Sequence, residues 1–492
     1  MNEETGQGGL TGGWHVSIGG TTYGPYEWAH VVAWVREGRI GPDALLWQPG
    51  FAQWIPAQQI PGLFVEAPSP SAPGAGGPRS RRRLWGIVAG TATVVVAGAV
   101  VGILFGTGVL GHDTAKEETA KEETWVYADG SGDFPTLEEA VANDRSGSVI
   151  RLGSGTFTLT DSLSITRDLV LVGQGSDGAT ATTVSCAGTV VHVGDAMLIA
   201  TGIDFVCTYS GPNPANVVEA EDAKVDLTEC RFTGGNIGDT PDGDEYVAFK
   251  GNGLYFYGTT TGTVKGCVCT LNDHDGIAVD EEAEMTLEGN ECTDNGSSTY
   301  GGCGISVSGS AICTLTGNTC DSNGSCGIEG NGEVEITAID NLCRNNDASG
   351  IEVDFGGGEF TGNTCSGNRM VGMLIFNSFA KVTLQGNDCS SNGEAGIDVF
   401  FCVSCVVRDN TCLRNGTNGI EVGEGNDATI SVEENECSEN AEAGIYFGQG
   451  STGTAANNEC ARNTWGIHVD GSATPTLGKN NLHDNDTDLA QE

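Results

Sequence analysis

A short phrase, Gly-Ile-x-Val, recurs through the second half of the chain and places acidic residues at regular intervals. Its variable position x is Glu352, Asp398 and Glu421 in three copies, and Asp354 lies two residues after Glu352. If each copy is a strand on one of many stacked turns, these side chains point outward in one row, which Leu374 interrupts. Two carboxylates about 5–10 Å apart can act as acid and base in glycoside cleavage.

The same row offers oxygen ligands for a divalent cation. Asp280, Glu352 and Asp354 are candidate ligands, and Ca²⁺ is the cation that such a carboxylate set favours. The alternative is that all these residues are ordinary outward-facing polar side chains on an acidic domain. The sequence requires no cofactor, and Ca²⁺ stays a possibility.

The repeat itself predicts the fold. A second phrase, Asn-x-Cys-x-x-Asn-Gly or a variant, precedes most copies of Gly-Ile-x-Val, and the period is near 23 residues. Short β-branched runs at that period are typical of a right-handed parallel β-helix in which each turn stacks about 4.8 Å above the last. We expect about 14–15 turns and a rod of about 70 Å. The asparagines should lie at the bends, in the left-handed conformation, and form ladders of hydrogen bonds. The fold class is therefore mainly β.

Charge is unevenly distributed along the chain. The net charge is −44, whereas residues 1–83 hold six basic and six acidic residues and are neutral. An acidic surface excludes binding of nucleic acid through its phosphates. It favours cations, basic partners or a divalent metal as the ligand.

All 18 cysteines lie at or after Cys186. Those of the Asn-x-Cys phrase fall at inward positions and are expected to form a stack of small apolar side chains. Cysteines outside this stack are better placed for disulfides, and the candidates are Cys303, Cys326, Cys402 and Cys405. Cysteines confined to one part of the chain suggest an oxidising compartment for that part.

Residues 84–110 are 27 residues without charge, which predicts a single transmembrane helix. Arg79 and the run Arg81, Arg82 and Arg83 precede it, so the positive-inside rule predicts a cytoplasmic N-terminus and an extracellular or periplasmic β-helix. The predicted order is a disordered tail (1–12), a small domain (13–65), a Pro/Gly linker with a basic flank (66–83), the span (84–110), a charged stalk (111–124) and the β-helix (125–488).

The small N-terminal domain, a predicted α+β unit, is rich in tryptophan. Its phrases Gly24-Pro25-Tyr26, Leu45-Leu46-Trp47 and Trp54-Ile55-Pro56, with Trp34 in a predicted helix over 27–37, resemble a bacterial GYF-like domain. The resemblance implies that Tyr26 and Trp34 bind a proline-rich or other peptide. The triplet that names the family reads Gly38-Arg39-Ile40 here. These aromatic residues would otherwise simply form the core of a small domain.

The start of the long repeat carries a second resemblance. Residues 128–137 (ADGSGDFPTL) resemble the opening of pectin-esterase and pectate-lyase-type β-helices, and the later repeats are similar to NosD-like and carbohydrate-binding β-helix repeats. Thr136 and Glu139 predict a capped helix over 137–143. The catalytic phrases of pectin esterases, polygalacturonases and pectate lyases are absent from the sequence.

Two functions remain open from the sequence. The first is a membrane-anchored surface protein whose β-helix binds polysaccharide, cations or a surface partner without catalysis. The second is a polysaccharide lyase or glycosidase that uses the acidic row. They differ in whether Glu352, Asp354, Asp398 and Glu421 are replaceable one at a time.

Overall fold

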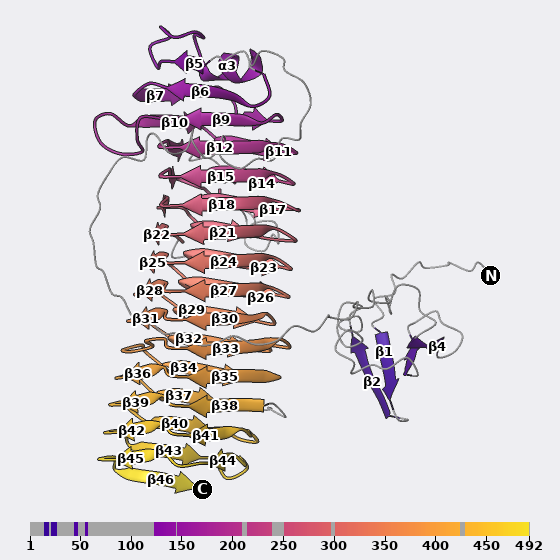
Figure 1. The fold of residues 1–492 in the computed structure, drawn as a ribbon, viewed down its shortest axis with the longest axis vertical. Coiled ribbons are helices and arrows are strands. Elements are labelled where there is room, and N and C mark those ends of the chain that lie inside the picture. The colour runs from indigo at the N-terminus through magenta and orange to yellow at the C-terminus, as the bar shows by residue number, and fades with distance from the viewer. Residues whose placement is uncertain are drawn as a thin grey trace, which may run out of the picture. The chain divides into compact units, whose positions relative to one another are not determined.

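The computed structural model describes residues 14–18, 21–26, 44–47, 55–57, 123–143, 145–208, 214–238, 250–296, 301–423 and 429–491. The chain divides into two compact units, residues 1–114 and residues 115–492. The long unit is a stack of parallel strands that runs from β5 to β46 (Figure 1).

The described part of the N-terminal unit is an antiparallel sheet in the order β2-β1-β3-β4. Its strands are β1 (Trp14–Ile18), β2 (Thr21–Tyr26), β3 (Leu45–Trp47) and β4 (Ile55–Pro56). Tyr26 ends β2 opposite Trp14, and Leu46 and Ala57 are buried. Trp34 and the helix predicted over 27–37 lie outside the described residues.

The second unit is a right-handed parallel β-helix with three sheets, because successive strands along the chain pass to the three sheets in turn. In the described residues, sheet 1 has 15 strands. They are β5 (Glu123–Val126), β6 (Ser148–Leu152), β9 (Leu169–Val172), β12 (Met197–Thr201), β15 (Lys224–Thr228), β18 (Thr261–Lys265), β21 (Glu284–Glu288), β24 (Ile312–Thr316), β27 (Glu335–Ile339), β30 (Gly357–Thr361), β33 (Lys381–Gln385), β35 (Ser404–Arg408), β38 (Thr429–Glu433), β41 (Thr454–Ala456) and β44 (Thr476–Leu477).

Sheet 2 holds the Gly-Ile-x-Val strands and has 14 members in the same described range. They are β8 (Leu163–Ile165), β11 (Val191–Gly194), β14 (Val218–Glu221), β17 (Leu254–Tyr257), β20 (Ile277–Val279), β23 (Ile305–Gly309), β26 (Ile328–Gly332), β29 (Ile351–Asp354), β32 (Met373–Phe376), β34 (Ile397–Phe400), β37 (Ile420–Val422), β40 (Ala443–Phe447), β43 (Trp465–Val469) and β46 (Thr487–Gln491).

Sheet 3 carries the Asn-x-Cys phrase. Its first part is β7 (Gly155–Thr158), β10 (Thr182–Cys186), β13 (Asp204–Cys207), β16 (Arg231–Thr233), β19 (Val268–Thr270), β22 (Glu291–Thr293), β25 (Thr319–Asp321), β28 (Leu342–Arg344) and β31 (Thr364–Ser366), and its second is β36 (Thr411–Leu413), β39 (Glu436–Ser438), β42 (Glu459–Ala461) and β45 (Asn481–His483). Two single bridges through Asp388 join the parts.

The core is a column of inward-facing side chains, one set per turn. The cysteines of the Asn-x-Cys phrase form one stack of fully buried side chains: Cys269, Cys292, Cys320, Cys343, Cys365, Cys389, Cys412, Cys437 and Cys460. All 18 cysteines are buried, and none of them forms a disulfide. The disulfides predicted for Cys303, Cys326, Cys402 and Cys405 are therefore absent.

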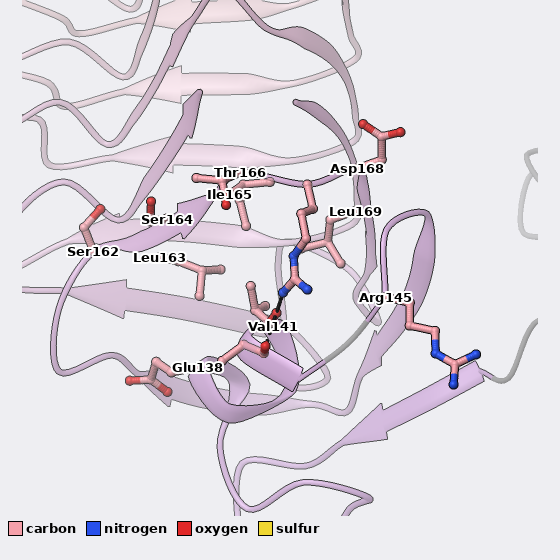
Figure 2. A pocket seen from close by; sticks show the side chains of 12 residues that line it. Glu138, Val141, Arg145, Ser162, Leu163, Ser164, Ile165, Thr166, Asp168 and Leu169 are labelled. Carbon is pink, nitrogen blue, oxygen red and sulfur yellow. Dashed lines mark hydrogen bonds between the residues drawn. The ribbon is translucent and has the colours of Figure 1, made fainter. Parts of the chain in front are cut away.

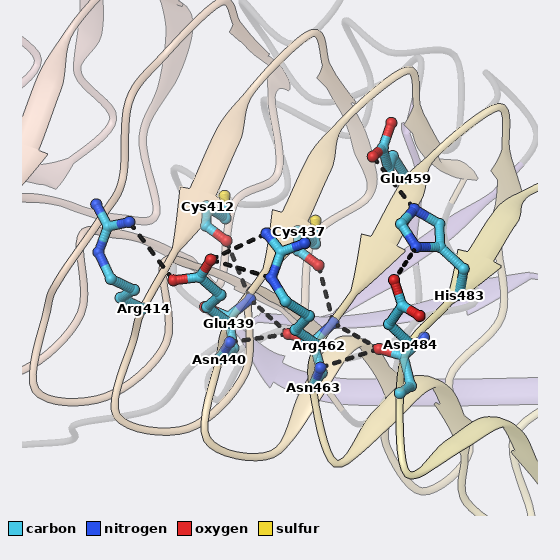
Figure 3. Close-up of polar contacts among 11 residues, drawn as sticks. Cys412, Arg414, Cys437, Glu439, Asn440, Glu459, Arg462, Asn463, His483 and Asp484 are labelled. Carbon is cyan, nitrogen blue, oxygen red and sulfur yellow. Dashed lines mark hydrogen bonds and ion pairs between the residues drawn. The ribbon is translucent and has the colours of Figure 1, made fainter.

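Two ladders of buried asparagine hold the bends on either side of sheet 3. In a typical step, the Nδ2 and backbone N–H of Asn341 both donate to Oδ1 of Asn363, at 2.9 and 3.0 Å, and Nδ2 also donates to the carbonyl of Leu315. Near the C-terminus the same pattern joins Asn440 to Asn463 (Figure 3). Such ladders satisfy buried backbone groups that the bends would otherwise leave unpaired.

The predicted ladders are confirmed, but the predicted left-handed conformation of the ladder asparagines is wrong. Positive φ angles fall on the residue just before the ladder position, as at Asp340 (54°) and Glu439 (60°). These preceding residues face solvent, where their charges can pair between turns. Glu439, for example, lies 2.9 Å from Arg462 (Figure 3).

The predicted helix forms as α3 (Leu137–Asn143). The Glu139 N–H donates to Oγ1 of Thr136 at 3.2 Å, which satisfies one of the free N–H groups at the helix start. Leu137 and Ala140 are buried in the same core as the first turns. The helix thus covers the open end of the stack and blocks pairing at its first edge.

The prediction of a transmembrane helix at 84–110, and with it of a single-pass membrane protein, is corrected here. No helix in the part of the chain that the structure describes is long and apolar enough to cross a membrane. Residues 84–110 themselves lie outside that part.

Candidate functional site

The outward residues of sheet 2 form the row that the sequence predicts. Strand register pairs Glu329 with Glu352, Glu352 with Leu374, Leu374 with Asp398 and Asp398 with Glu421. The row continues through Tyr446 to His468. Successive members start from backbones about 4.8 Å apart, because they lie on neighbouring parallel strands.

The C-terminal half of this row lines a groove of about 600 Å³. The groove extends over five successive turns, from the bend before β32 to β43. Its lining residues are Val371, Glu394, Ala395, Asp398, Thr417, Asn418, Glu421, Ala441, Glu442, Tyr446, Thr464, Trp465 and His468. We call this surface the C-terminal groove.

Asp398 is the most perturbed acid of the C-terminal groove. Its Oδ1 is shielded from solvent and has no hydrogen-bond partner among the described residues. Burial, together with the charges of Glu421 and Glu394, raises the pKa of Asp398 to about 8. At neutral pH this carboxyl group therefore holds a proton and can donate it.

Glu421 lies beside Asp398 but has a partner. Its Oε2 accepts a hydrogen bond from Nδ2 of Asn418 at 2.8 Å. Burial raises the pKa of Glu421, the Asn418 hydrogen bond opposes that shift, and the charges of Glu442 and Glu394 add to it. The two neighbouring carboxyl groups thus have different environments, which is how enzymes separate an acid from a base.

Aromatic side chains close the C-terminal end of the groove. The rings of Tyr446 and His468 are 5.2 Å apart, and those of Trp465 and His468 are 4.7 Å apart. All three are half-buried. The ring planes are tilted by 47° and 35°, so the cluster offers several apolar ring faces with polar edges next to the two acids.

Glu394 and Glu442 belong to a second row, which sequence reasoning missed. They lie two residues before Gly396 and Gly444, at the bend that leads into sheet 2. Backbone hydrogen bonds link this bend row: the N–H of Thr417 donates to the carbonyl of Glu394, and the N–H of Glu442 donates to the carbonyl of Thr417. The signal that could have found them is their fixed position, two residues before each Gly-Ile phrase. Trp465, one residue before Gly466, was missed as well.

Two of the four predicted acids lie elsewhere. Glu352 is on the N-terminal side of Leu374 and accepts a contact of 3.4 Å from Sγ of Cys326. Asp354 is in the next outward row, where its Oδ1 accepts from Nδ2 of Asn377 at 3.0 Å. Neither residue lines the C-terminal groove, so the structure brings together only the pair Asp398 and Glu421.

The predicted cation ligands are also spread out. Asp280 accepts hydrogen bonds from Ser308 at 2.8 Å and from Tyr255 at 3.3 Å. In the strand register, Ser308 pairs with Asn331 and Asn331 pairs with Asp354, so Asn331 lies between Ser308 and Asp354. Within the described ranges, no three His, Cys, Asp or Glu side chains are placed to hold a metal ion.

A second hollow, of about 280 Å³, lies between α3 and the loop after β8 (Figure 2). Arg167 crosses it and donates to the carbonyls of Val141 and Ala142, at 2.9 and 3.2 Å, near the end of α3. A cation at that position satisfies the free carbonyls of a helix end. This hollow therefore serves the cap of the β-helix.

Comparison with known families agrees with this architecture. The pattern of the right-handed β-helix region matches residues 181–341 and 326–486, which together span more than half of the chain. The chain belongs to the right-handed β-helix family. Residues 14–63 match GYF domain 2, so both predicted resemblances are confirmed. No curated protein sequence matches the chain significantly.

Several solved structures are similar to this chain over 72–74% of its length. A periplasmic alginate epimerase is 13% identical over 73% of this chain and 83% of that chain, with a TM-score of 0.48. The A-module of a mannuronan C-5 epimerase from Azotobacter vinelandii is 12% identical over 72% and 91%, with a TM-score of 0.41. The catalytic unit of an α-1,3-glucanase from Streptomyces thermodiastaticus is 16% identical over 74% and 69%, with a TM-score of 0.43. At these identities the likeness concerns the fold alone.

Proposed function

We propose that this right-handed β-helix protein binds a polysaccharide in the C-terminal groove. The observation that carries the proposal is the combination of Tyr446, Trp465 and His468 with the acids of one open groove of about 600 Å³. Ring faces pack against the apolar faces of sugars, and carboxylates accept hydrogen bonds from sugar hydroxyls. The groove follows the stacking direction of the turns, which suits a linear chain.

The test is a binding measurement with the full chain against neutral, acidic and amine-bearing polysaccharides. Trp465→Ala should weaken binding by about tenfold or more, because it removes the largest ring of the groove. Phe401→Ala is the matched control, since Phe401 is 48% exposed and lies outside the groove. Equal losses in both variants, or no binding by the unmodified chain, would contradict the proposal.

A second function, cleavage of the bound glycan, is favoured by the raised pKa of Asp398 beside Glu421. In this mechanism Asp398 gives its proton to the glycosidic oxygen while the Glu421 carboxylate attacks the anomeric carbon. Water, deprotonated by Asp398, then releases the sugar from Glu421 and restores both groups. Asp398 and Glu421 extend from neighbouring backbones about 5 Å apart, and this spacing favours the retaining mechanism.

Release of reducing sugar ends measures this second function. Asp398→Asn and Glu421→Gln should each lower the rate by about 100-fold or more. Glu352→Gln, in the same row but outside the groove, should leave the rate unchanged. Binding without release of reducing ends would leave a binding protein and remove the catalytic proposal.

For the N-terminal unit, we propose that the GYF domain binds a peptide through Tyr26 and Trp34. The family match to residues 14–63 supports this proposal. Titration of the full chain with a proline-rich peptide tests it, and Trp34→Ala should remove the binding. An unchanged affinity in that variant would contradict the assignment.

A further inference from the structure

The C-terminal groove carries four acidic side chains, Glu394, Asp398, Glu421 and Glu442, and its described lining contains neither lysine nor arginine. None of these four acids forms a salt bridge within the described residues, and the polar partner seen for Glu421 is the neutral amide of Asn418. The negative charge of the groove is therefore not compensated by the protein.

Other acids on the same β-helix do have cationic partners. Glu434 lies 2.7 Å from Arg408, Glu439 lies 2.9 Å from Arg462, and Glu219 lies 2.6 Å from Lys250. The chain has only 22 basic residues for 66 acidic ones, so cations are scarce. The cations of these three ion pairs lie outside the lining of the groove.

The four acids are arranged along the groove in two rows. Asp398 and Glu421 are neighbours in the sheet row, about 5 Å apart in backbone position. Glu394 and Glu442 are two turns apart in the bend row, with Thr417 between them. No three of them are placed to hold one metal ion. A ligand that neutralises them must instead carry several positive charges at intervals along its length.

Repulsion among these groups shows that the groove favours positive charge. The charges of Glu421 and Glu394 add to burial in raising the pKa of Asp398, and those of Glu442 and Glu394 act in the same direction on Glu421. Asp398 also has a shielded oxygen, Oδ1, without a hydrogen-bond donor. A bound ammonium group would bring positive charge beside Glu394, Glu421 and Glu442 and a donor for Oδ1 of the protonated Asp398.

From these observations, and resting on the proposed function of the groove, we infer that its ligand is a linear polysaccharide of amino sugars with free amines. The rings of Trp465, Tyr446 and His468 would hold the sugar faces, while Glu394 and Glu442 at the rims of the groove pair with ammonium groups. A polymer of uronic acids is excluded from the same groove, because like charges would meet without a cation between them.

The experiment compares three hexasaccharides on the full chain by calorimetry, at a mildly acidic pH that keeps sugar amines protonated. They are the β-1,4 hexamer of glucosamine, the hexamer of N-acetylglucosamine, which has the same backbone without charge, and a hexamer of galacturonate. Hexalysine is a polycation without sugar rings. One variant is the double variant Glu394→Gln/Glu442→Gln. The other is Glu436→Gln, an exposed control outside the groove.

We expect the glucosamine hexamer to bind about tenfold or more tightly than the acetylated hexamer, and this preference to fall with added salt. The double variant should reduce the preference to about twofold, whereas Glu436→Gln should keep it. Trp465→Ala should weaken both hexamers, and hexalysine should bind more weakly than the glucosamine hexamer.

Equal affinity for the amine-bearing and acetylated hexamers, with both lost in Trp465→Ala, would overturn the inference while leaving glycan binding in place. Hexalysine binding as tight as that of the glucosamine hexamer would also overturn it, because the attraction would then be general to polycations. Binding of no hexasaccharide would overturn both the inference and the proposed function.

Discussion

Replacing Asp398 with asparagine should stabilise the β-helix, and the gain should grow as the pH rises. The folded protein holds the Asp398 proton up to a pKa of about 8, whereas the model value for an aspartate is 3.8. Between these values the unfolded chain binds fewer protons than the folded one, so a rise in pH favours unfolding. Asparagine keeps the shape of the side chain and has no proton to lose.

The shift of about 4 pKa units corresponds to at most about 5 kcal/mol, at 1.36 kcal/mol per unit. The free energy of unfolding of the asparagine variant, minus that of the unmodified chain, should therefore rise by up to about 5 kcal/mol between pH of about 4 and 8, and then level off. Any constant effect of the amide group cancels in this comparison. Denaturant unfolding across that pH range measures the difference.

Asp321→Asn is a control of opposite sign. Although burial opposes the shift, hydrogen bonds from Asn345, Arg344 and Ser322 and the Arg344 charge lower the pKa of Asp321. That variant should lose stability relative to the unmodified chain as the pH rises through the folded pKa to the ordinary value of 3.8, so its scan extends below a pH of about 4. Between a pH of about 4 and 8 its difference from the unmodified chain should stay level. A pH-independent difference for Asp398→Asn would refute the assignment of a buried, protonated Asp398.

Three further predictions concern the stability of the stack. Asn341→Ala should cost about 3 kcal/mol in denaturant unfolding, because four ladder hydrogen bonds lose a partner at a buried position. Asn480→Ala should cost about 1 kcal/mol, because Asn480 is half-buried at the ladder's end and water can replace the lost bonds; equal costs would contradict a ladder role. Gly358→Ala should cost about 3 kcal/mol or more, since a Cβ there would meet the Ile336 carbonyl, whereas Gly386→Ala, with open space and a φ of 65°, should cost about 1 kcal/mol. A thiol reagent should find no reactive cysteine in the native chain and 18 after unfolding without reductant; a lower final count would reveal disulfides.

The amino-acid sequence alone predicts the fold of the second unit because its signals are local and repeated. The period near 23 residues, the inward Ile and Val of each Gly-Ile-x-Val phrase and the capped helix at 137–143 each depend on neighbouring residues. The row of outward residues follows from the same register. Repetition makes one correct assignment hold for every turn.

The same local patterns misled where the outcome depends on contacts between turns. Cys303 and Cys326 precede Gly-Ile in successive turns, yet both remain free thiols. The left-handed conformation belongs to Asp340 and its equivalents because the ladder asparagines need their own N–H groups for the next turn. The spacing of residues in the sequence predicts neither result. Both depend on how side chains and backbone N–H groups of one turn are oriented toward the next turn.

What the sequence by itself determined is the β-helix, its acidic character and the order of outward residues, since periodicity and strand geometry fix which face each side chain occupies. What only the tertiary structure decided is which acids act together. Glu352, Asp354, Asp398 and Glu421 look alike in the repeat, but Leu374 and the bend residues Glu394 and Glu442 separate one pair from the other. The packing of successive turns places Asp398 in a groove. Burial and neighbouring charge there raise the pKa of Asp398 to about 8.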